Sequence, residues 1–482
     1  MQATGALTLI QLNDTHAQMN LHWEYFWENG RPVYRKTGGF ARLATLIQQI
    51  RAQCHGACLL VDCGDEIHGT GVAQWTKGAA IVPPLKALGI DAMTPGNWEF
   101  GFGPEVLRSR VAEMGFPVLG CNVSHAVTNL PEFGSSLIRE VAGVRVGLLG
   151  VTSPIVIERM PRHFGQGLRF ADPVEALPRH VHELREKDKV DLVVLISHMG
   201  LPQDMKLATA VEGIDIVLSS HTHDRLARPI VVGKTVIIQS GFSGSFLGRL
   251  RIEVANGNIR AFEHELIEVT ESTVPDPAVQ AIVDEQVGPY CDRLNEVVGS
   301  IESPLHRMSV LESPMDNLIT DSYLSMTGTD VSFSHGWRYG APLVAGDVTQ
   351  GDLWQIIPTN PEVFTAEMTG EEIRETIEES LESVYASNPL RQKGGYPIRV
   401  SGLSVIVRIN NPKGARVQQL DIAGKPYRAD KLYTVAGAGD QDLSLVNGKK
   451  GTGVAAIEAI GRHFKAGSPV YTEVTNGKFI AI

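Results

Sequence analysis

The stretch LTLIQLNDTH, residues 7–16, indicates the fold class, because an apolar run ends in side chains that can bind a metal ion. The apolar part reads as a buried strand, and Asp14 and His16 follow where it ends. A glycine-led run at residues 38–53 then has the spacing of a helix, and ACLLVDCGD, residues 57–65, reads as a second buried strand. Strand, helix and strand in this order predict a layered α/β domain.

The same pattern continues through the first half of the chain. Further strands are expected within residues 143–152, 191–200, 214–223 and 234–241, and a charged helix within 173–189. Potential metal ligands stand at or just after apolar runs, namely Asp14, His16, Asp65, Asn97, His198, His221 and His223. One such residue alone is more often a turn, a helix cap or a core histidine. The whole set, at the carboxyl ends of neighbouring strands, points to one metal-binding crevice.

The mixture of ligand types narrows the choice of metal. Carboxylate, imidazole and amide donors together suit Mn²⁺, Zn²⁺ or Fe²⁺ better than Mg²⁺ or Ca²⁺, which prefer oxygen ligands. An aspartate between two ligand groups bridges two ions about 3.5–4 Å apart, and such a pair lowers the pKa of a bound water. We therefore expect two divalent ions, Mn²⁺ first with Zn²⁺ or Fe²⁺ as alternatives, in a hydrolase for tetrahedral oxyanion esters.

Length and charge limit the domain count and the partners. A chain of 482 residues exceeds one ordinary core, so two or three domains are expected. With 43 Lys and Arg against 54 Asp and Glu, the net charge is −11, and no long basic run occurs. A nucleic-acid polymer and an anionic membrane surface are therefore not expected as partners. A small anionic ester is the default substrate.

Apolar segments and cysteines place few constraints on the cellular location and on disulfide bonding. No apolar segment reaches the roughly 20 residues of a membrane span, and residues 1–8 lack the basic-then-apolar pattern of a signal peptide. The sequence is thus that of a cytoplasmic protein or of a mature exported form. The number of cysteines, 5, is odd and includes no C-x-x-C pair, so structural thiols are expected rather than a disulfide framework.

The pattern changes near Arg249. Two alternating runs around Asn256-Gly257 predict a hairpin that closes the first domain. Residues 274–300 read as a long polar helix, a plausible connector. A second, α+β domain then follows, with a helix at 369–385 and late strands at 402–410 and 431–437.

These residues and their order resemble the calcineurin-like metallophosphoesterases in the first domain and the 5'-nucleotidase superfamily over nearly the whole chain. The resemblance implies a four-layer α/β/β/α catalytic domain at 1–270, a helical connector at 271–300 and a smaller α+β substrate-binding domain at 301–482. It also implies Asp65 as a bridge between two ions, one bound by Asp14, His16, Asp65 and His223 and the other by Asp65, Asn97, His198 and His221.

The chain departs from the nucleotidases at two places. Their metal loop usually reads Asn-His-Glu-Phe-Asp, with the histidine and the last aspartate forming a catalytic dyad, whereas this chain has Trp98 and Gly101. Their second domain offers an Asn-Gly-Gly-x-Arg segment to the phosphate and an aromatic ring in a Pro-Phe-x-Asn motif. Here SHGWRYG, residues 334–340, keeps the arginine as Arg338, and Thr359 replaces the phenylalanine.

These departures resemble the SoxB thiosulfohydrolase branch of the superfamily. TPGNWEF at 94–100, WRYG at 337–340 and GGYPIRVSGL at 394–403 carry the resemblance, although that branch commonly has histidine at the place of Asn97. It implies hydrolysis of a cysteine S-thiosulfonate on a sulfur-carrier protein, release of sulfate, and a periplasmic location, with a cytoplasmic location as the alternative. The implied catalytic residues are Asp65, Asn97 and Arg338, and the implied substrate-binding residues are Arg338, Arg399 and His335.

Trp98 fits a sulfur leaving group. An alkoxide needs a general acid, which contributes about 10²–10⁴-fold to the rate, whereas a thiolate with a pKa near 8.5 needs little protonation. Alternatively, Trp98 packs on the loop of an ordinary phosphoesterase that uses another acid. Structural salt bridges are the alternative for Arg399 and Arg338, and a turn cap is the alternative for His335.

Three hypotheses follow. The first is a binuclear hydrolase acting on a sulfur-linked sulfonate, and the second is a nucleotidase-type phosphoesterase with altered base recognition. The third, a degenerate binding protein, is disfavoured because every predicted metal ligand is intact. Metal analysis separates the third from the others, and a substrate panel separates the first two.

Overall fold

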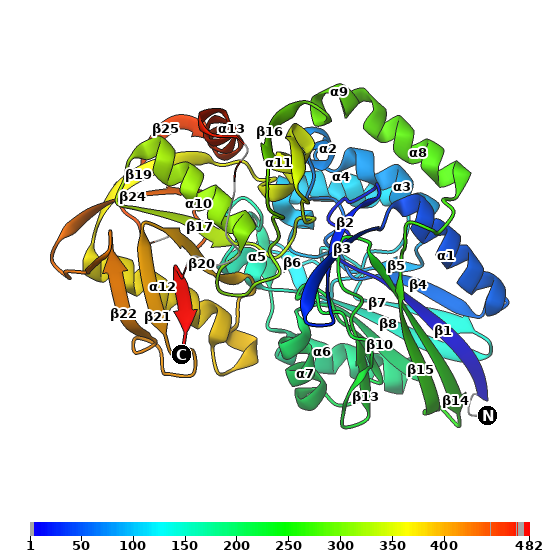
Figure 1. Ribbon diagram of the computed structural model, residues 1–482. Helices are drawn as coiled ribbons and strands as arrows, with labels where there is room; N and C mark the ends of the chain where they lie inside the picture. The colour runs from blue at the N-terminus through cyan, green and yellow to red at the C-terminus, as the bar shows by residue number, and fades with distance from the viewer. Residues whose placement is uncertain (1–3, 444, 469, 471–476) are drawn as a thin grey trace. The chain divides into compact units, whose positions relative to one another are not determined.

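The computed structural model describes residues 4–443, 445–468, 470 and 477–482 (Figure 1). The chain folds into two compact units, and both are discontinuous in sequence. Unit 1 comprises Met1–His22 with Lys36–Pro289, and unit 2 comprises Trp23–Arg35 with Tyr290–Ile482.

Two mixed sheets form the centre of unit 1. The first has the order β15-β14-β1-β4-β5, with β1, β4 and β5 parallel, and the second has the order β12-β13-β11-β10-β8-β7, with β8, β10, β11 and β13 parallel. Their bounds are β1 Thr4–Leu12, β4 Cys58–Asp62, β5 Ala92–Met93, β7 Ser136–Val141, β8 Val144–Thr152, β10 Leu192–His198, β11 Ile216–Leu218, β12 Ile230–Val232, β13 Thr235–Ile238, β14 Phe246–Ala255 and β15 Asn258–Glu268.

The two sheets pack face to face. One buried cluster joins Leu9 and Val61 of the first sheet to Leu148, Val194 and Ile216 of the second. Every second residue of a strand points toward this interface, because successive side chains point to opposite faces of a sheet. Valine, isoleucine and leucine occupy most of these positions. Helices cover the outer faces, α1, α3 and α8 over the first sheet and α6 and α7 over the second, so the predicted four-layer α/β/β/α arrangement is present (Figure 1).

The helices of unit 1 follow strands as predicted, with differences in length. The charged helix expected at 173–189 is α6 continued by a wider π-helical turn, Glu183–Lys187. A short antiparallel pair, β6 Val123–His125 and β9 Leu168–Phe170, completes the unit. The helix bounds are α1 Phe40–Gln53, α2 Gly71–Thr76, α3 Val82–Ala87, α4 Pro104–Met114, α5 Ile155–Glu158, α6 Pro173–His182, α7 Leu201–Ala210 and α8 Pro277–Val287.

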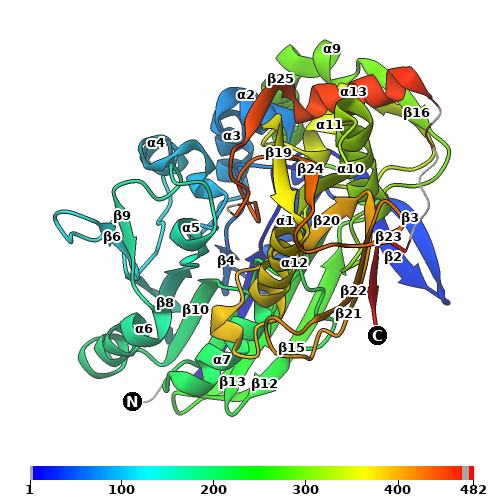
Figure 2. The same ribbon diagram turned by 90° about the vertical axis from the view of Figure 1, so that its left-hand side faces the viewer.

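Unit 2 is built on a five-stranded sheet with the order β20-β17-β24-β19-β25. Helices α10 and α13 pack on one face of this sheet and α12 on the other (Figure 2). A four-stranded sheet, β23-β22-β21-β26, shares a buried cluster with α12. The bounds are β16 Val297–Ile301, α10 Pro314–Thr327, β17 Val331–Gly336, β18 Gly346–Thr349, α11 Gln350–Ile356, β19 Glu362–Thr369, α12 Gly370–Tyr385, β20 Tyr396–Ser401, β21 Leu403–Val407, β22 Val417–Ile422, β23 Lys425–Pro426, β24 Leu432–Ala438, β25 Lys450–Ala455, α13 Ala456–Ala466 and β26 Phe479–Ala481.

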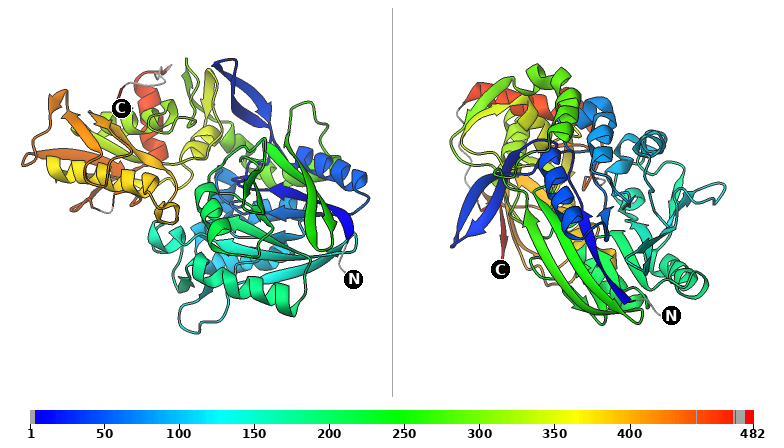
Figure 3. Two further views of the ribbon diagram at one scale, coloured as in Figure 1. Left: turned by 90° about the horizontal axis from the view of Figure 1, so that it is seen from below. Right: turned by 90° about the vertical axis from the view of Figure 1, so that its right-hand side faces the viewer.

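One segment differs from the sequence-based expectation, and another had no structure assigned to it from the sequence. The long polar helix expected over 274–300 is α8 followed by a separate short helix, α9 Cys291–Leu294, because Gly288 and Pro289 interrupt the run, and residues 297–300 are already strand. The aromatic segment after His22 is a β-hairpin, β2 His22–Glu28 and β3 Arg31–Thr37, with Asn29-Gly30 at its turn (Figure 3). Among the described residues, no helix is long and apolar enough to cross a membrane.

Candidate metal centre

All seven predicted metal ligands lie at or beyond the carboxyl ends of parallel strands in unit 1. Asp14 and His16 follow β1, Asp65 follows β4, and Asn97 follows β5. His198 is the last residue of β10, and His221 and His223 follow β11. Because parallel strands present their carboxyl ends at the same edge, five chain segments converge on one place.

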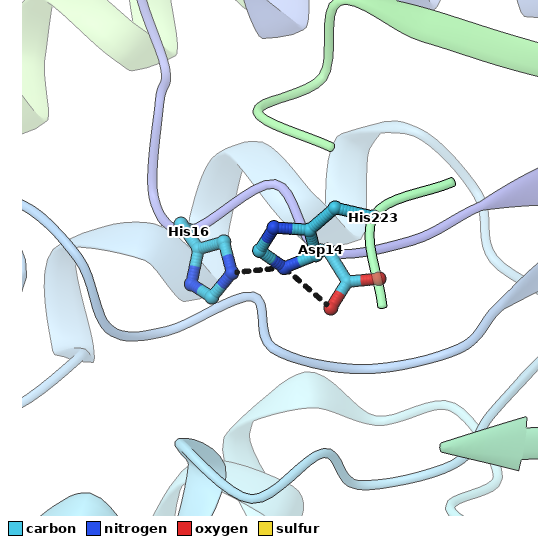
Figure 4. A group of neighbouring side chains, drawn as sticks. All are labelled: Asp14, His16 and His223. Carbon is cyan, nitrogen blue, oxygen red and sulfur yellow. Dashed lines mark hydrogen bonds and ion pairs between the residues drawn. The ribbon is translucent and has the colours of Figure 1, made fainter. Parts of the chain in front are cut away.

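One group of ligands consists of Asp14, His16 and His223 (Figure 4). The Nε2 atoms of His16 and His223 are 3.1 Å apart, and His223 Nε2 is 3.4 Å from Asp14 Oδ1. Two imidazole nitrogens and a carboxylate oxygen that converge at these distances form the donor set of a divalent cation. The geometry brings together three of the four ligands expected for the first ion.

The second group consists of Asp65, His198 and His221. Asp65 Oδ2 is 3.2 Å from His198 Nε2 and 4.0 Å from His16 Nε2, so it faces both groups. The other oxygen, Oδ1, accepts a hydrogen bond from the backbone N–H of Trp98 at 2.8 Å. This arrangement suits a carboxylate that bridges two ions through one oxygen while the loop holds the other.

Backbone groups orient His198 and Asn97. His198 Nδ1 lies 2.6 Å from the carbonyl oxygen of Cys63, so this nitrogen carries the proton and Nε2 is presented as a donor atom to a cation. Asn97 Oδ1 is buried and has no hydrogen-bond partner within the described part of the chain. A buried amide oxygen without a donor is costly, and a metal ion is a partner that offsets the cost. The donor set therefore fits a pair of divalent ions.

Charge in the site also favours cations. Burial alone opposes ionisation of Asp14 and Asp65, yet the neighbouring histidines hold the pKa of each carboxyl below its ordinary value. Burial likewise opposes protonation of His198, but Asp65 and Asp14 outweigh it and raise its pKa to about 10. Two buried carboxylates thus hold a proton on His198, which a bound cation displaces.

Glu99 organises the two loops that carry Asp65 and Asn97, and the sequence analysis did not single it out. Its Oε2 accepts from the backbone N–H groups of Asp65 at 2.7 Å and Gly96 at 2.6 Å. Its Oε1 accepts from the N–H of Glu66 at 2.6 Å. Burial raises the pKa of Glu99 to about 7. The available signal was an acidic residue two positions beyond a predicted ligand, in the loop TPGNWEF.

The ligand loops have unusual backbone conformations. Five ligands, all non-glycine, have positive φ, between 48° and 70°, namely Asp14, His16, Asp65, His221 and His223. Such residues are uncommon and cost about 1–3 kcal/mol each unless their surroundings hold them. Gly96 makes room for the site, because a Cβ there would lie 2.2 Å from Asp65 Oδ1 and 2.5 Å from His198 Cε1.

Trp98 forms part of a packed aromatic group beside the site. It is 5% exposed and stacks on His68, with ring centroids 4.3 Å apart at 15°, and it contacts Phe164 edge-on. Burial lowers the pKa of His68 to about 3, so this imidazole stays neutral near pH 7. Gly101 lies against the same ring, since a Cβ there would be 3.2 Å from His68 Cδ2. Position 98 therefore presents an indole held by its neighbours.

In unit 2, the predicted substrate-binding residues have different surroundings. His335 is the penultimate residue of β17, buried, with Nδ1 2.5 Å from Asp442 Oδ2. Arg338 is half-buried in a run of buried residues just after that strand. Thr359 Oγ1 is buried, at the position where nucleotidases have a phenylalanine.

Arg399 has surroundings that do not support the predicted substrate contact. It is 2% exposed, and its Nε lies 2.9 Å from Asp316 Oδ2. Its other nitrogens donate to the carbonyl oxygens of Val310 at 2.9 Å and Ser309 at 3.2 Å. Arg307 contacts the other oxygen of Asp316 at 2.9 Å. A guanidinium engaged in this way stabilises the interior of unit 2, which is the structural alternative weighed for this residue.

Family comparisons agree with both units. The model of the calcineurin-like phosphoesterases matches residues 7–225, and the model of the 5'-nucleotidase C-terminal domain matches residues 297–439. Among curated proteins, the chain is 26% identical over 498 residues to the trifunctional nucleotide phosphoesterase YfkN of Bacillus subtilis, and the match covers 91% of this chain and 32% of that one. The chain therefore spans about a third of the length of that relative.

Solved structures give matches of full length. The sulfate thiohydrolase SoxB of Thermus thermophilus has a TM-score of 0.92 at 25% identity, covering 100% of this chain and 98% of that one. A 5'-nucleotidase precursor, also from Thermus thermophilus, has a TM-score of 0.86 at 25% identity, covering 99% of both chains.

The fold, the two ligand groups and these matches define a binuclear metallophosphoesterase, one class of metal-dependent hydrolase. Within that class, the chain belongs to the 5'-nucleotidase superfamily. Among the members of that superfamily, it is similar to SoxB.

Proposed function

We propose that the protein hydrolyses a sulfur-linked sulfonate, in the form of a cysteine S-thiosulfonate presented by a sulfur-carrier protein, and releases sulfate. The observation that carries this proposal is the group around Trp98. An indole stacked on a neutral histidine occupies the position next to a metal ligand, and neither ring is an acid near pH 7. A reaction at this site suits a leaving group that departs without a proton.

In the proposed reaction, a water oxygen attacks the sulfonate sulfur and the adjacent sulfur–sulfur bond breaks. Sulfate leaves with the new oxygen, the bonding electrons remain on the carrier's sulfur as a persulfide anion, and the protons of water pass to solvent. Two divalent ions, when bound, supply the activated water and neutralise charge on the sulfonate. The residues that would hold these ions are Asp14, His16, Asp65, Asn97, His198, His221 and His223, with Asp65 shared between the two ligand groups.

Residues of the chain have two further tasks in this proposal. Arg338 is proposed to bind the sulfonate, because a guanidinium matches a tetrahedral oxyanion with two parallel hydrogen bonds. Asn97 keeps its buried amide oxygen toward the ions. Mn²⁺ is the proposed metal, and the periplasm is the proposed location.

A nucleotidase-type activity on nucleotides or related phosphate esters is the second candidate. The specific observation in its favour is the equal identity, 25%, to a SoxB and to a 5'-nucleotidase precursor over nearly the full chain. Thr359 argues against ordinary base recognition, since a hydroxyl offers no ring on which a base can stack.

A substrate panel decides between the two. Protein loaded with Mn²⁺ or Zn²⁺ is incubated with an S-sulfonated or S-thiosulfonated cysteine peptide and, in parallel, with nucleoside monophosphates, and released sulfate and phosphate are measured. We expect kcat/KM for the thiol-linked substrates to exceed that for nucleotides by at least tenfold. Efficient nucleotide hydrolysis with no release of sulfate would contradict the proposal. The location is tested separately, by measuring the amount of the protein in the periplasmic and cytoplasmic fractions of a producing cell after membranes have been removed.

A further inference from the structure

The loop that follows β11 carries two predicted metal ligands one residue apart, and they belong to different ligand groups. His221 is in the group of Asp65, and His223 is in the group of Asp14. Both histidines have positive φ, 70° and 63°, which non-glycine residues keep only where their surroundings hold them. The spacing of the two groups therefore depends on the contacts that fix this short loop.

One buried side chain, the amide of Gln239, reaches this loop from the neighbouring strand. Gln239 directly follows β13, which pairs in parallel with β11, and it is fully buried. Its Nε2 donates to the carbonyl oxygen of Ser220 and to Ser219 Oγ, both at 2.9 Å. The nitrogen of the amide thus fixes the backbone immediately before His221.

The oxygen of the same amide fixes the rest of the loop. Gln239 Oε1 accepts from Thr222 Oγ1 at 3.1 Å, between the two histidines, and from the backbone N–H of Asp224, just after the second one. Both protons and both acceptor positions of the amide are therefore used. Because the nitrogen faces a carbonyl oxygen and the oxygen faces an N–H, only one orientation of the amide satisfies all four contacts.

Thr222 extends these contacts to the segment of a third ligand. Its Oγ1 accepts at 3.0 Å from the backbone N–H of Leu201, the first residue of α7, which lies three residues beyond His198. One hydroxyl and one amide therefore join the loops that follow β10 and β11. Removing the amide of Gln239 would leave buried hydrogen-bonding groups without partners, a cost that the loop avoids only by moving.

We propose that Gln239 is a positioning residue for the metal centre. It holds His221 and His223 at the spacing that two ions require, and Thr222 carries the same constraint to the segment of His198. Residues that orient metal ligands typically contribute about 10–100-fold to metal affinity. This role concerns the binding of the ions and does not depend on which ester or sulfonate the protein hydrolyses.

The test compares Gln239→Met, Thr222→Val and the double variant Gln239→Met/Thr222→Val. Methionine keeps the approximate size of glutamine without its hydrogen bonds, and valine keeps the shape of threonine without its hydroxyl. The matched control is Asn122→Leu, which removes another buried amide of unit 1. Asn122 Nδ2 donates to the carbonyl oxygen of Thr152 at 2.8 Å, and its Oδ1 accepts from the N–H of Thr152 at 3.0 Å, away from the loops of the predicted ligands.

Three measurements are made on each variant. The Kd of each ion is obtained by titrating the metal-free protein with Mn²⁺ in competition with a chelator of known affinity. The visible absorption spectrum of the Co²⁺-loaded protein reports the arrangement of the ligands around the ions. Urea denaturation of the metal-free protein measures the stability of the fold.

Gln239→Met is expected to raise the Kd of both ions by at least about tenfold and to change the Co²⁺ spectrum. Thr222→Val gives a smaller rise, and the double variant loses less than the product of the two single losses, because the two side chains act through a shared contact. Asn122→Leu lowers the urea midpoint, as Gln239→Met does, but it leaves both Kd values and the Co²⁺ spectrum as in the parent.

Parental Kd values with an unchanged Co²⁺ spectrum in Gln239→Met would overturn the proposal, and so would single losses that multiply in the double variant. An equal rise in Kd in Asn122→Leu would also overturn it, since the effect would then follow from lost stability. If Gln239→Met does not fold, Thr222→Val decides, and parental Kd values in that variant overturn the proposal. None of these measurements uses a substrate, so their outcome is independent of the panel that tests the proposed function.

Discussion

Asp65 uses its two carboxylate oxygens for different tasks. Oδ1 accepts from the backbone of Trp98, and Oδ2 faces His198 and His16, which belong to different ligand groups. A side chain that joins two groups in this way couples their occupancy. Losing it removes a ligand from both ions and exposes the ions to each other's charge.

Asp65→Ala is therefore expected to lose both metal ions and all turnover, because each ion keeps an incomplete set of ligands. Elemental analysis after gel filtration measures this. Asp284→Ala, at an exposed position on α8, is the control and is expected to keep the metal content of the parent. Two ions per chain in Asp65→Ala would contradict the bridging assignment.

Trp98 offers a second prediction at the residue scale. Trp98→His with Gly101→Asp introduces an acid pair beside the leaving atom, and phosphate monoesterase activity is expected to rise. General acids contribute about 10²–10⁴-fold, and a smaller gain is expected here because the new pair must fit against His68. Trp98→Phe is the control, with no gain in phosphate release expected from a ring that has no proton to give. Phosphate release from nucleoside monophosphates is measured.

The residues that could be predicted from the sequence are those whose function depends on their place after a strand. The seven ligands follow apolar runs, so their convergence followed from strand direction alone. Glu99 and Asp442 act through contacts with backbone N–H groups or with a ring from a distant segment, and no local pattern reveals such contacts. Arg399 shows the converse, because an arginine in a glycine-rich motif is engaged by Asp316 and two carbonyl groups.

The loops that carry the predicted metal ligands pack closely against one another, which requires a glycine at position 96. Gly96 lies against Asp65 and His198. Gly96→Ala is expected to abolish binding of the second ion while leaving the sheets intact, because the added methyl group occupies the place of the bridging carboxylate. Circular dichroism and metal analysis together measure this. Gly288→Ala, where a Cβ would meet nothing within 4 Å, is the control and is expected to change neither. Unaltered metal binding in Gly96→Ala would show that the loop relaxes without cost.

The junction of β10 and α7 contains a buried acid with a predictable effect on stability. Burial raises the pKa of Asp204 from 3.8 to about 7, and Ser197 Oγ donates to its carboxyl at 2.5 Å. Between about pH 4 and 7 the folded state binds more protons than the unfolded state, so the contribution of Asp204 to the free energy of unfolding falls as the pH rises. The loss is on the order of 4 kcal/mol at most and is complete above pH 7.

Asp204→Asn removes this titration. The variant is expected to unfold at higher denaturant concentration than the parent at pH 8 and at a similar concentration at pH 4. Urea denaturation of the metal-free protein at both pH values measures the difference. Asp284→Asn, at the surface of α8, serves as the control with no expected change. An equal difference at the two pH values would show that Asp204 is ionised throughout.

At the scale of elements, periodicity and strand direction predicted the layered sheets of unit 1, and the turn Asn256-Gly257 predicted the hairpin of β14 and β15. The hairpin of β2 and β3 was not predicted, although Asn29-Gly30 at its turn is the same signal that predicted the hairpin of β14 and β15. The helix expected over 274–300 is divided, since Pro289 removes an N–H that a continuous helix requires.

At the scale of the whole molecule, the seven predicted metal ligands all lie in unit 1. A free ion at about 1000 times its Kd stabilises the folded state by about 4 kcal/mol. Removal of metal by a chelator is therefore expected to lower the unfolding temperature of unit 1 and to leave that of unit 2 unchanged. Differential scanning calorimetry with and without EDTA measures this, and Asp65→Ala is the control, since the chelator is expected to have no further effect on it. A single unfolding transition that shifts as a whole would contradict this prediction.

The placement of Trp23–Arg35 in unit 2 has a consequence for how the chain acquires its structure. During synthesis these residues leave the ribosome before Lys36–Pro289 of unit 1, whereas the rest of unit 2, which begins at Tyr290, follows that segment. A two-stranded ribbon is marginally stable by itself in water. The ribbon therefore cannot pack against the rest of unit 2 until the segment after Tyr290 has been synthesised. Neither unit can be produced as one uninterrupted fragment, and a nascent chain stalled near residue 289 would contain Trp23–Arg35 without the rest of unit 2.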